Sequence, residues 1–174
     1  RKKYFIVQSF TSSTIFNSLI YQDYVDIACY QPYDFLFNAS KYFFKTIKPD
    51  YYIITRHDVW PNHIVEAKKL SMKIFYINAN LHKNSIWNYS FMKGCSTFIL
   101  NKFDLIMVPS NRIKNNIINY VDSSKIKIVA DTRFQQIYDR YINNKDNQIL
   151  PEQLLKSNNI IFGSIDENDE NIIL

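Results

Sequence analysis

The chain has 174 residues, 47% of them hydrophobic, and a net charge of +5. This composition is typical of a globular protein, and the length is enough for one α/β domain and the start of another. Its two glycines, Gly94 and Gly163, exclude both Gly-rich phosphate loop motifs. The positive charge favours acidic partners such as nucleic acid, phosphorylated lipid or an anionic membrane surface, although an ordinary Lys-rich surface explains it equally well.

Short apolar runs alternate with helical periodicity along the first part of the chain. The runs typical of buried strands are 4–8, 26–30, 51–55, 73–77, 104–108 and 125–129. The stretches between and after them predict helices at 12–20, 36–48 and 61–70, a helical region ending near 102, and helices at 110–120 and 132–142. This alternation indicates βαβ units, so we expect an α/β fold with a Rossmann-like parallel sheet covered on both faces.

The pattern changes after residue 142. A polar stretch at 143–158 contains Pro151 and predicts an interdomain linker. A new strand is expected at 159–162, so a second domain would begin there and occupy 159–174. Because the chain starts with Arg rather than Met and both ends look cut, we expect a piece of a longer protein. It contains no run of eighteen apolar residues that could span a bilayer.

Ligands of open parallel sheets bind at the carboxyl ends of the strands. The segment 56–62 is the richest such place, since it holds Arg56, His57, Asp58 and Trp60 at one strand-to-helix turn. Asp58 is the candidate catalytic residue, although an Asp near a helix start is more often a cap. His57 and His63 lack a metal-ligand arrangement, so we expect exposed or structural histidines and no metal site.

Two further strand ends carry polar groups. Asp131 and Arg133 follow the run 125–129, where a capped helix with a surface salt bridge is the simpler explanation. Gly163 and Ser164 follow the last predicted strand, and backbone N–H groups at a helix start there could hold a phosphate or carboxylate. None of these places decides a function when it is taken alone.

Taken in order, however, seven segments resemble the bacterial Kdo transferase family of lipopolysaccharide synthesis. They are Tyr30–Asp34, Ile47–Asp50, Arg56–Asn62, Tyr76–Leu81, Lys102–Ile106, Val129–Phe134 and Phe162–Ser164. Among them, Trp-Pro-Asn at 60–62 matches a family motif. Asn-Ala-Asn-Leu at 78–81 is similar to the family's Asn-Ala-Arg-Leu, and Asp-Thr-Arg-Phe at 131–134 matches part of its Gly-Asp-Thr-Arg-Phe.

The resemblance implies a GT-B glycosyltransferase, in which two Rossmann-like domains face each other across a cleft. Residues 1–142 would form the acceptor-side domain and 159–174 the start of the donor domain. The family implies CMP-Kdo (Kdo is 3-deoxy-D-manno-octulosonic acid) as donor substrate and lipid A or its precursor as acceptor. The reaction would be an inverting-type displacement that needs no metal or cofactor. It also implies the cytoplasmic face of the bacterial inner membrane, an anionic lipid surface and no nucleic-acid partner.

The resemblance also implies roles for particular residues. Asp58 would act at the reaction centre. The acceptor side of the cleft would be lined by Arg56, Asn62 and Asn78. The donor would be bound by Asp131, Arg133, Gly163 and Ser164.

Four positions depart from the family pattern: Asp58 replaces a Glu, Ala130 a Gly, Gln135 an Asp and Ile165 a Thr. The family's membrane anchor and its Gly-Glu motif with the catalytic base would lie before Arg1, so we expect the 174-residue chain alone to be inactive. Two alternatives stay open. One is another GT-B transferase for lipid or nucleotide-sugar substrates, and the other is a non-catalytic Rossmann-like binding module, which the changes at Asp58 and Ala130 favour.

Overall fold

The computed structural model describes residues 4–12, 24–36, 38–56 and 59–144, with a few single positions and short pieces between 151 and 169. The chain divides into two compact units, Arg1–Thr132 and Arg133–Leu174. In the second unit the described structure is chiefly helix α6, which begins at Thr132 and ends at Asn143. Across the described ranges, no helix has the length and apolar character needed to cross a bilayer.

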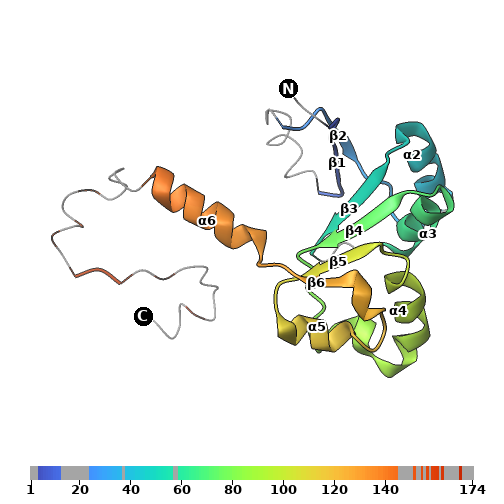
Figure 1. Ribbon diagram of the computed structural model, residues 1–174. Coiled ribbons are helices and arrows are strands. Elements are labelled where there is room, and N and C mark those ends of the chain that lie inside the picture. The colour runs from blue at the N-terminus through green and yellow to red at the C-terminus, as the bar shows by residue number, and fades with distance from the viewer. Residues whose placement is uncertain are drawn as a thin grey trace. The chain divides into compact units, whose positions relative to one another are not determined.

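The described residues of the first unit form six strands in two parallel sheets (Figure 1). The strands are β1 (Val7–Phe10), β2 (Ile27–Tyr30), β3 (Tyr51–Thr55), β4 (Lys73–Ile77), β5 (Leu105–Val108) and β6 (Ile126–Ile128). Within the part of the chain that the structure describes, β1 and β2 pair with each other alone, whereas the other strands form a four-stranded sheet in the order β3-β4-β5-β6. Each adjacent pair is parallel, so the strands of each sheet end at the same edge.

Helices connect the strands in the pattern that parallel pairing requires. The α-helices that the structure describes in this unit are α2 (Ala39–Ile47), α3 (Pro61–Lys69), α4 (Lys93–Leu100) and α5 (Asn111–Ile117). Pro61 occupies the first turn of α3, where its missing N–H costs nothing. The helical region predicted to end near residue 102 consists of two short 3₁₀ turns, Ile86–Asn88 and Ser90–Met92, followed by α4.

The hydrophobic core lies between these helices and one face of the four-stranded sheet. Strand residues that point to this face are fully buried, among them Ile54, Tyr76 and Val108. They meet side chains from every helix: Phe44 of α2, Ile64 and Ala67 of α3, Ile99 and Leu100 of α4, and Ile113 and Ile117 of α5. The four helices therefore share one face, as the ribbon also shows (Figure 1).

The alternation of side chains along the strands leaves a second face. On β3, Tyr51 and Ile53 point away from the core and are 52% and 55% exposed. Phe75 of β4 belongs to the same face and stacks on Tyr51, with ring centroids 5.9 Å apart. Among the described residues no helix covers this face, and the helix predicted at 12–20 lies, apart from residue 12, outside the described residues.

Asp104 ties three elements of the core together just before β5. Its carboxylate accepts hydrogen bonds from Lys68 of α3 at 3.0 and 3.1 Å and from the backbone N–H of Ile74 at 2.8 Å. Partial burial acts to raise the pKa of this carboxyl group, but these hydrogen bonds and the charges of Lys68 and Lys73 outweigh it and hold the pKa below its usual value. The group is therefore an anion at neutral pH and fixes α3 against the sheet.

Candidate functional site

The candidate site is formed by the loops at the carboxyl ends of the strands. Gln31 to Asp34 follow β2, Arg56 follows β3, Asn78 follows β4, and Asp131 and Thr132 come shortly after β6. Parallel pairing brings the loops of β3 to β6 to one edge of their sheet. This edge is where open α/β sheets bind ligands, so the geometry agrees with the place that the sequence indicated.

Asp34 links the loop after β2 to the start of α3. Its carboxylate accepts hydrogen bonds from the backbone N–H groups of Asn62 and His63, both at 3.1 Å. The Asn62 side chain in turn donates to the Asp34 carbonyl at 2.6 Å. The helix's own N-cap residue, Trp60, has no oxygen in its side chain and makes no cap bond. Asp34 therefore caps α3 from 28 residues away and complements the positive end of its dipole.

The same carboxylate also holds the ring of His63. The imidazole Nδ1 lies 2.9 Å from Asp34 Oδ1 and 3.2 Å from Ser40 Oγ, and the residue is fully buried. Burial lowers the pKa of His63, and this effect exceeds the opposing hydrogen bond and charge of Asp34, which raise it. His63 is accordingly neutral at pH 7, and a proton on Nδ1 would be donated to Asp34.

The other ring nitrogen of His63, Nε2, is buried without a hydrogen-bond partner. The rings of Phe43, Phe44 and Trp60 surround the imidazole at centroid distances of 5.7 to 6.4 Å. Burying a charged imidazole among these apolar rings would cost far more free energy than burying a neutral one, so the neutral form of His63 is favoured. The Asp34–His63 pair thus packs against Trp60 and holds the start of α3 in place.

The turns after β3 and β4 both begin with a left-handed residue. Arg56 has φ 59° and Asn78 has φ 50°. Asn adopts this conformation readily, but Arg does so at a cost of about 1 kcal/mol. The Arg56 backbone is held there from both sides, because its N–H donates to Ile77 O at 3.1 Å and its carbonyl accepts from the buried hydroxyl of Tyr76. A non-glycine residue kept in this region marks the Arg56 turn as the strained part of the site.

Asn78 connects the end of β4 with the start of α6. Its side-chain nitrogen donates to Thr132 Oγ1 at 2.7 Å, and its Oδ1 accepts from the Thr132 N–H at 3.3 Å. The neighbouring residue, Asp131, is buried. Asn78 was predicted for the acceptor side and Asp131 for the donor side, and the structure links Asn78 to Thr132, the residue that follows Asp131.

The remaining predicted site residues differ in where they lie and in whether the structure describes them. Asn62 is at the site, but its side chain is engaged with Asp34. Arg133 belongs to the second unit. Asp58, His57, Gly163 and Ser164 lie outside the described residues. The structure therefore brings Arg56 and Asn78 to adjacent turns and Asn62 to the start of α3.

Asp34 and His63 are the site residues that sequence reasoning did not single out. Asp34 stands in the predicted loop after a strand and in the resemblance, but no local pattern connects it to a helix 28 residues later. One signal was available, because Trp60 and Pro61 leave the start of α3 without a side-chain oxygen, so an acceptor from elsewhere was required. His63, expected to be exposed or structural, is buried.

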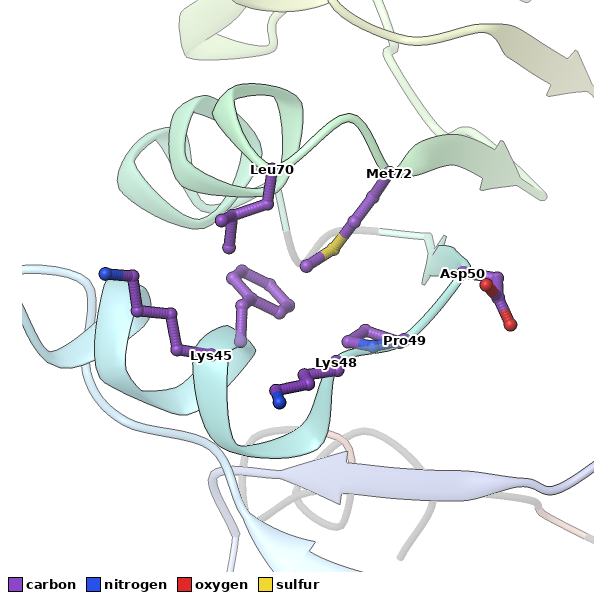
Figure 2. Close-up of a pocket in the computed structure, with 7 residues that line it drawn as sticks. Lys45, Lys48, Pro49, Asp50, Leu70 and Met72 are labelled. Carbon is purple, nitrogen blue, oxygen red and sulfur yellow. The ribbon is translucent and has the colours of Figure 1, made fainter.

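A separate hollow of about 540 Å³ lies beside the carboxyl-terminal ends of α2 and α3. It is lined by Lys45 and Lys48 from the end of α2, by Asp50 before β3, and by apolar side chains that include Leu70 and Met72 (Figure 2). Because Asp50 precedes the first residue of β3, this hollow is at the amino ends of the strands. It is therefore distinct from the edge that carries Arg56 and Asn78.

Comparison with known proteins gives a match over most of the first unit. The family model described as 3-deoxy-D-manno-octulosonic-acid transferase (kdotransferase) matches residues 2–136, which include every described residue of the site. The chain belongs to the Kdo transferase family. The resemblance noted in the sequence is thereby confirmed, and the parallel α/β fold agrees with it.

Two chlamydial relatives illustrate the relationship. The 3-deoxy-D-manno-octulosonic acid transferase of Chlamydia muridarum (strain MoPn / Nigg) is 25% identical over 127 residues, 72% of this chain and 30% of the relative. That of Chlamydia trachomatis serovar D is 26% identical over 90 residues, 51% of this chain and 21% of the relative. The chain thus aligns with less than a third of the length of these Kdo transferases.

Proposed function

We propose that the whole protein is an inverting GT-B glycosyltransferase that transfers Kdo from CMP-Kdo to lipid A or its precursor in lipopolysaccharide synthesis. The match of the Kdo transferase family over residues 2–136 carries this proposal. The site supports it, because polar residues of the family's motifs gather at the carboxyl ends of parallel strands. Substrate identity follows from the family and not from a bound ligand.

The proposed reaction is a single displacement. A hydroxyl oxygen of the acceptor forms a bond to the anomeric carbon of Kdo, while the bond from that carbon to the CMP phosphate oxygen breaks. CMP leaves with the bonding electrons, and the hydroxyl proton passes to a carboxylate base. No metal or cofactor is needed in this scheme, because the leaving phosphate already carries negative charge and cationic side chains can stabilise it.

The residues of this chain would divide between the two substrates. Asp58 would lie at the acceptor-side reaction centre, in the turn between Arg56 and α3. Arg56 and Asn78 begin adjacent turns and would line the acceptor side, with Asn62 held at the helix start by Asp34. The donor would be bound by Asp131, Arg133, Gly163 and Ser164.

We further propose that the protein works at the cytoplasmic face of the bacterial inner membrane. The acceptor is an anionic lipid, and the net charge of +5 is attractive to such a surface. The hollow beside Lys45 and Lys48 combines cationic side chains with an apolar lining. That combination suits contact with anionic headgroups.

Asp58→Asn in the whole protein is the most direct test of the site. If the charge of Asp58 has no part in catalysis, the substitution is nearly silent, since Asn has the same shape and replaces Asp in turns and helix caps at little cost. If its charge acts in catalysis, turnover of CMP-Kdo falls by roughly 100-fold or more, as for the loss of one preorganised electrostatic group. The melting temperature should stay constant, because the substitution preserves shape.

Two variants serve as controls for this measurement. Asp58→Glu restores the family's usual side chain and should keep or raise turnover. Asp139→Asn changes an exposed carboxylate on α6 that has no proposed role and should leave turnover unchanged. Wild-type turnover by Asp58→Asn would remove the catalytic role, and no turnover by the wild-type whole protein would favour a binding module.

A further inference from the structure

A second hollow, of about 330 Å³, lies beside the start of α3. The described residues that line it include Phe35 of the loop after β2, Lys41 of α2, and Asn62, Glu66 and Lys69 of α3. Because Asn62 is also a residue of the candidate site, the hollow continues from that site along the helix. Its volume is at the small end of ligand pockets, which suits one sugar ring with a substituent better than an extended chain.

Three polar side chains of this hollow come from one face of α3. Asn62, Glu66 and Lys69 are four and three residues apart, the spacing that places side chains above one another on a helix. The Asn62 amide is held by its bond to the Asp34 carbonyl. Lys69 donates to the Glu66 carboxylate at 2.6 Å, and the Glu66 side chain is 19% exposed. The helix therefore presents a fixed amide and a partly buried carboxylate to the hollow.

The charges of the lining favour a ligand with two kinds of polar group. Lys41 is exposed and has no carboxylate partner among the described residues, so with Lys69 it provides two positive charges against the single negative charge of Glu66. Lysine ammonium groups bind phosphate through charge-assisted hydrogen bonds. A carboxylate repels phosphate but accepts hydrogen bonds from hydroxyl groups. The lining thus matches a molecule that carries both phosphate and hydroxyls better than a bare phosphate ion.

Phe35 adds a flat apolar wall to this polar lining. Its side chain is 76% exposed, and its ring stacks on Tyr33 with centroids 5.6 Å apart and planes 17° apart. A sugar ring has apolar C–H faces and polar hydroxyl edges. An aromatic face beside a few placed polar groups is therefore a suitable lining for it.

We propose that this hollow binds a sugar that carries a phosphate monoester. Lys41 and Lys69 would contact the phosphate, Asn62 and Glu66 the hydroxyls, and Phe35 the face of the ring. The further assignment of this ligand to a phosphorylated sugar of the acceptor rests on the proposed function. The hollow would then hold the acceptor's polar group beside the helix start that belongs to the candidate site.

Binding of glucose 1-phosphate to the whole protein, followed by phosphorus NMR, tests the phosphate contact. Lys41→Gln should raise the dissociation constant at least about tenfold, because it removes a charged donor. Lys93→Gln is the matched control, since it removes the same charge from an exposed lysine at the start of α4 and should change the constant less than about twofold. Equal effects of the two substitutions, or no binding by the wild type, would overturn the proposal.

Inorganic phosphate tests whether the sugar is recognised as well. It should bind the wild type at least about tenfold more weakly than glucose 1-phosphate, because it makes no contact with Phe35 or Asn62. Glu66→Ala should remove most of this difference, since it takes away a hydroxyl acceptor and frees Lys69 for phosphate. Equal affinity of the wild type for both ligands would mean a general anion site and would overturn the sugar.

Steady-state kinetics with CMP-Kdo and the lipid acceptor identify the source of the sugar. If it belongs to the acceptor, Lys41→Gln should raise the acceptor KM at least about tenfold and change kcat less than about twofold, because the contact is the same in the ground and transition states. An unchanged KM would overturn the assignment to the acceptor. Turnover by a wild type that does not bind glucose 1-phosphate would refute the hollow alone, whereas binding without turnover would refute the proposed function and support the hollow.

Discussion

Asp34 combines three tasks in one carboxylate. It caps α3 through two backbone N–H groups, orients the His63 ring and connects the loop after β2 with the helix that carries Asn62. Such a group is more sensitive to truncation than an ordinary cap, because one of its partners, His63, is fully buried. The loss of the acceptor leaves the buried His63 with an unmet hydrogen bond.

Asp34→Ala should therefore destabilise the fold by about 2–3 kcal/mol, the sum of a lost cap and an unpaired buried donor. Asp34→Asn should cost less, since an amide oxygen still accepts from the helix. Urea unfolding of the variants measures both values. Asp50→Ala is the control, because this exposed aspartate should change stability by less than about 0.5 kcal/mol; an equal loss at both positions would contradict the cap.

His63 should make stability depend on pH in a definite direction. Burial lowers its pKa below the usual 6.5, so the folded state binds fewer protons than the unfolded state in this range. Its contribution is complete above pH 6.5 and is lost as the pH falls from 6.5 towards the lowered pKa.

His63→Gln tests this dependence because it removes the titrating group and keeps a side-chain donor. Between pH 7 and pH 5 the wild type should lose stability more steeply than the variant, as measured by urea unfolding. A wild type that becomes more stable over this range would mean that Asp34 raises the pKa of His63 above its usual value.

At the scale of elements, the helices differ in how their first turns are satisfied. α5 follows the local rule, since Ser110 precedes it and its Oγ accepts from the Ile113 N–H at 3.4 Å. α3 depends on Asp34, and Thr132 at the start of α6 donates its N–H to Asn78. The first N–H groups of α3 and the N–H of Thr132 thus find their acceptors in residues that follow other strands.

Ser110→Ala should lower the free energy of unfolding by about 1 kcal/mol through the loss of a local cap. Ser110→Asp should restore most of it, because Asp caps as well as Ser and suits the helix dipole. Ser123→Ala, at an exposed 3₁₀ turn, is the control. Thermal unfolding of the three variants would contradict the capping role if Ser110→Ala and Ser123→Ala were equivalent.

In the first unit, the candidate site lies at the carboxyl ends of the strands and a lysine-lined hollow lies at their amino ends (Figures 1 and 2). The proposed membrane contact predicts weak, electrostatic binding to anionic vesicles. Each lysine near such a surface contributes about 1 kcal/mol, and salt screens the attraction within about 10 Å.

Lys45→Glu combined with Lys48→Glu should therefore weaken binding to phosphatidylserine vesicles at least about tenfold in a sedimentation assay. The matched control is Lys83→Glu with Lys93→Glu, which makes the same change in net charge at two exposed lysines elsewhere. Equal weakening by both pairs would mean that only net charge matters. Binding that does not change between low and high salt would exclude an electrostatic contact altogether.

The sequence by itself determined the alternation of elements and the family. β3 and β4 were predicted with their observed ends, and α3 to within one residue, because β-branched runs and the Trp-Pro start are local signals. Motif order sufficed for the family, since Trp60–Asn62 and Asn78–Leu81 are contiguous in the chain. Those same motifs placed Arg56 and Asn78 at strand ends.

Tertiary structure alone decided how distant residues meet. The Asp34 cap, the buried His63 ring and the bond between Asn78 and Thr132 join positions 28 to 54 residues apart, and no periodicity records such pairs. The division of the sheet between β1 and β3 was also beyond the sequence, because a strand's pattern reveals its buried side chains but not its neighbours. Hydrogen bonding between strands is a non-local property, and it is settled only when the whole domain folds.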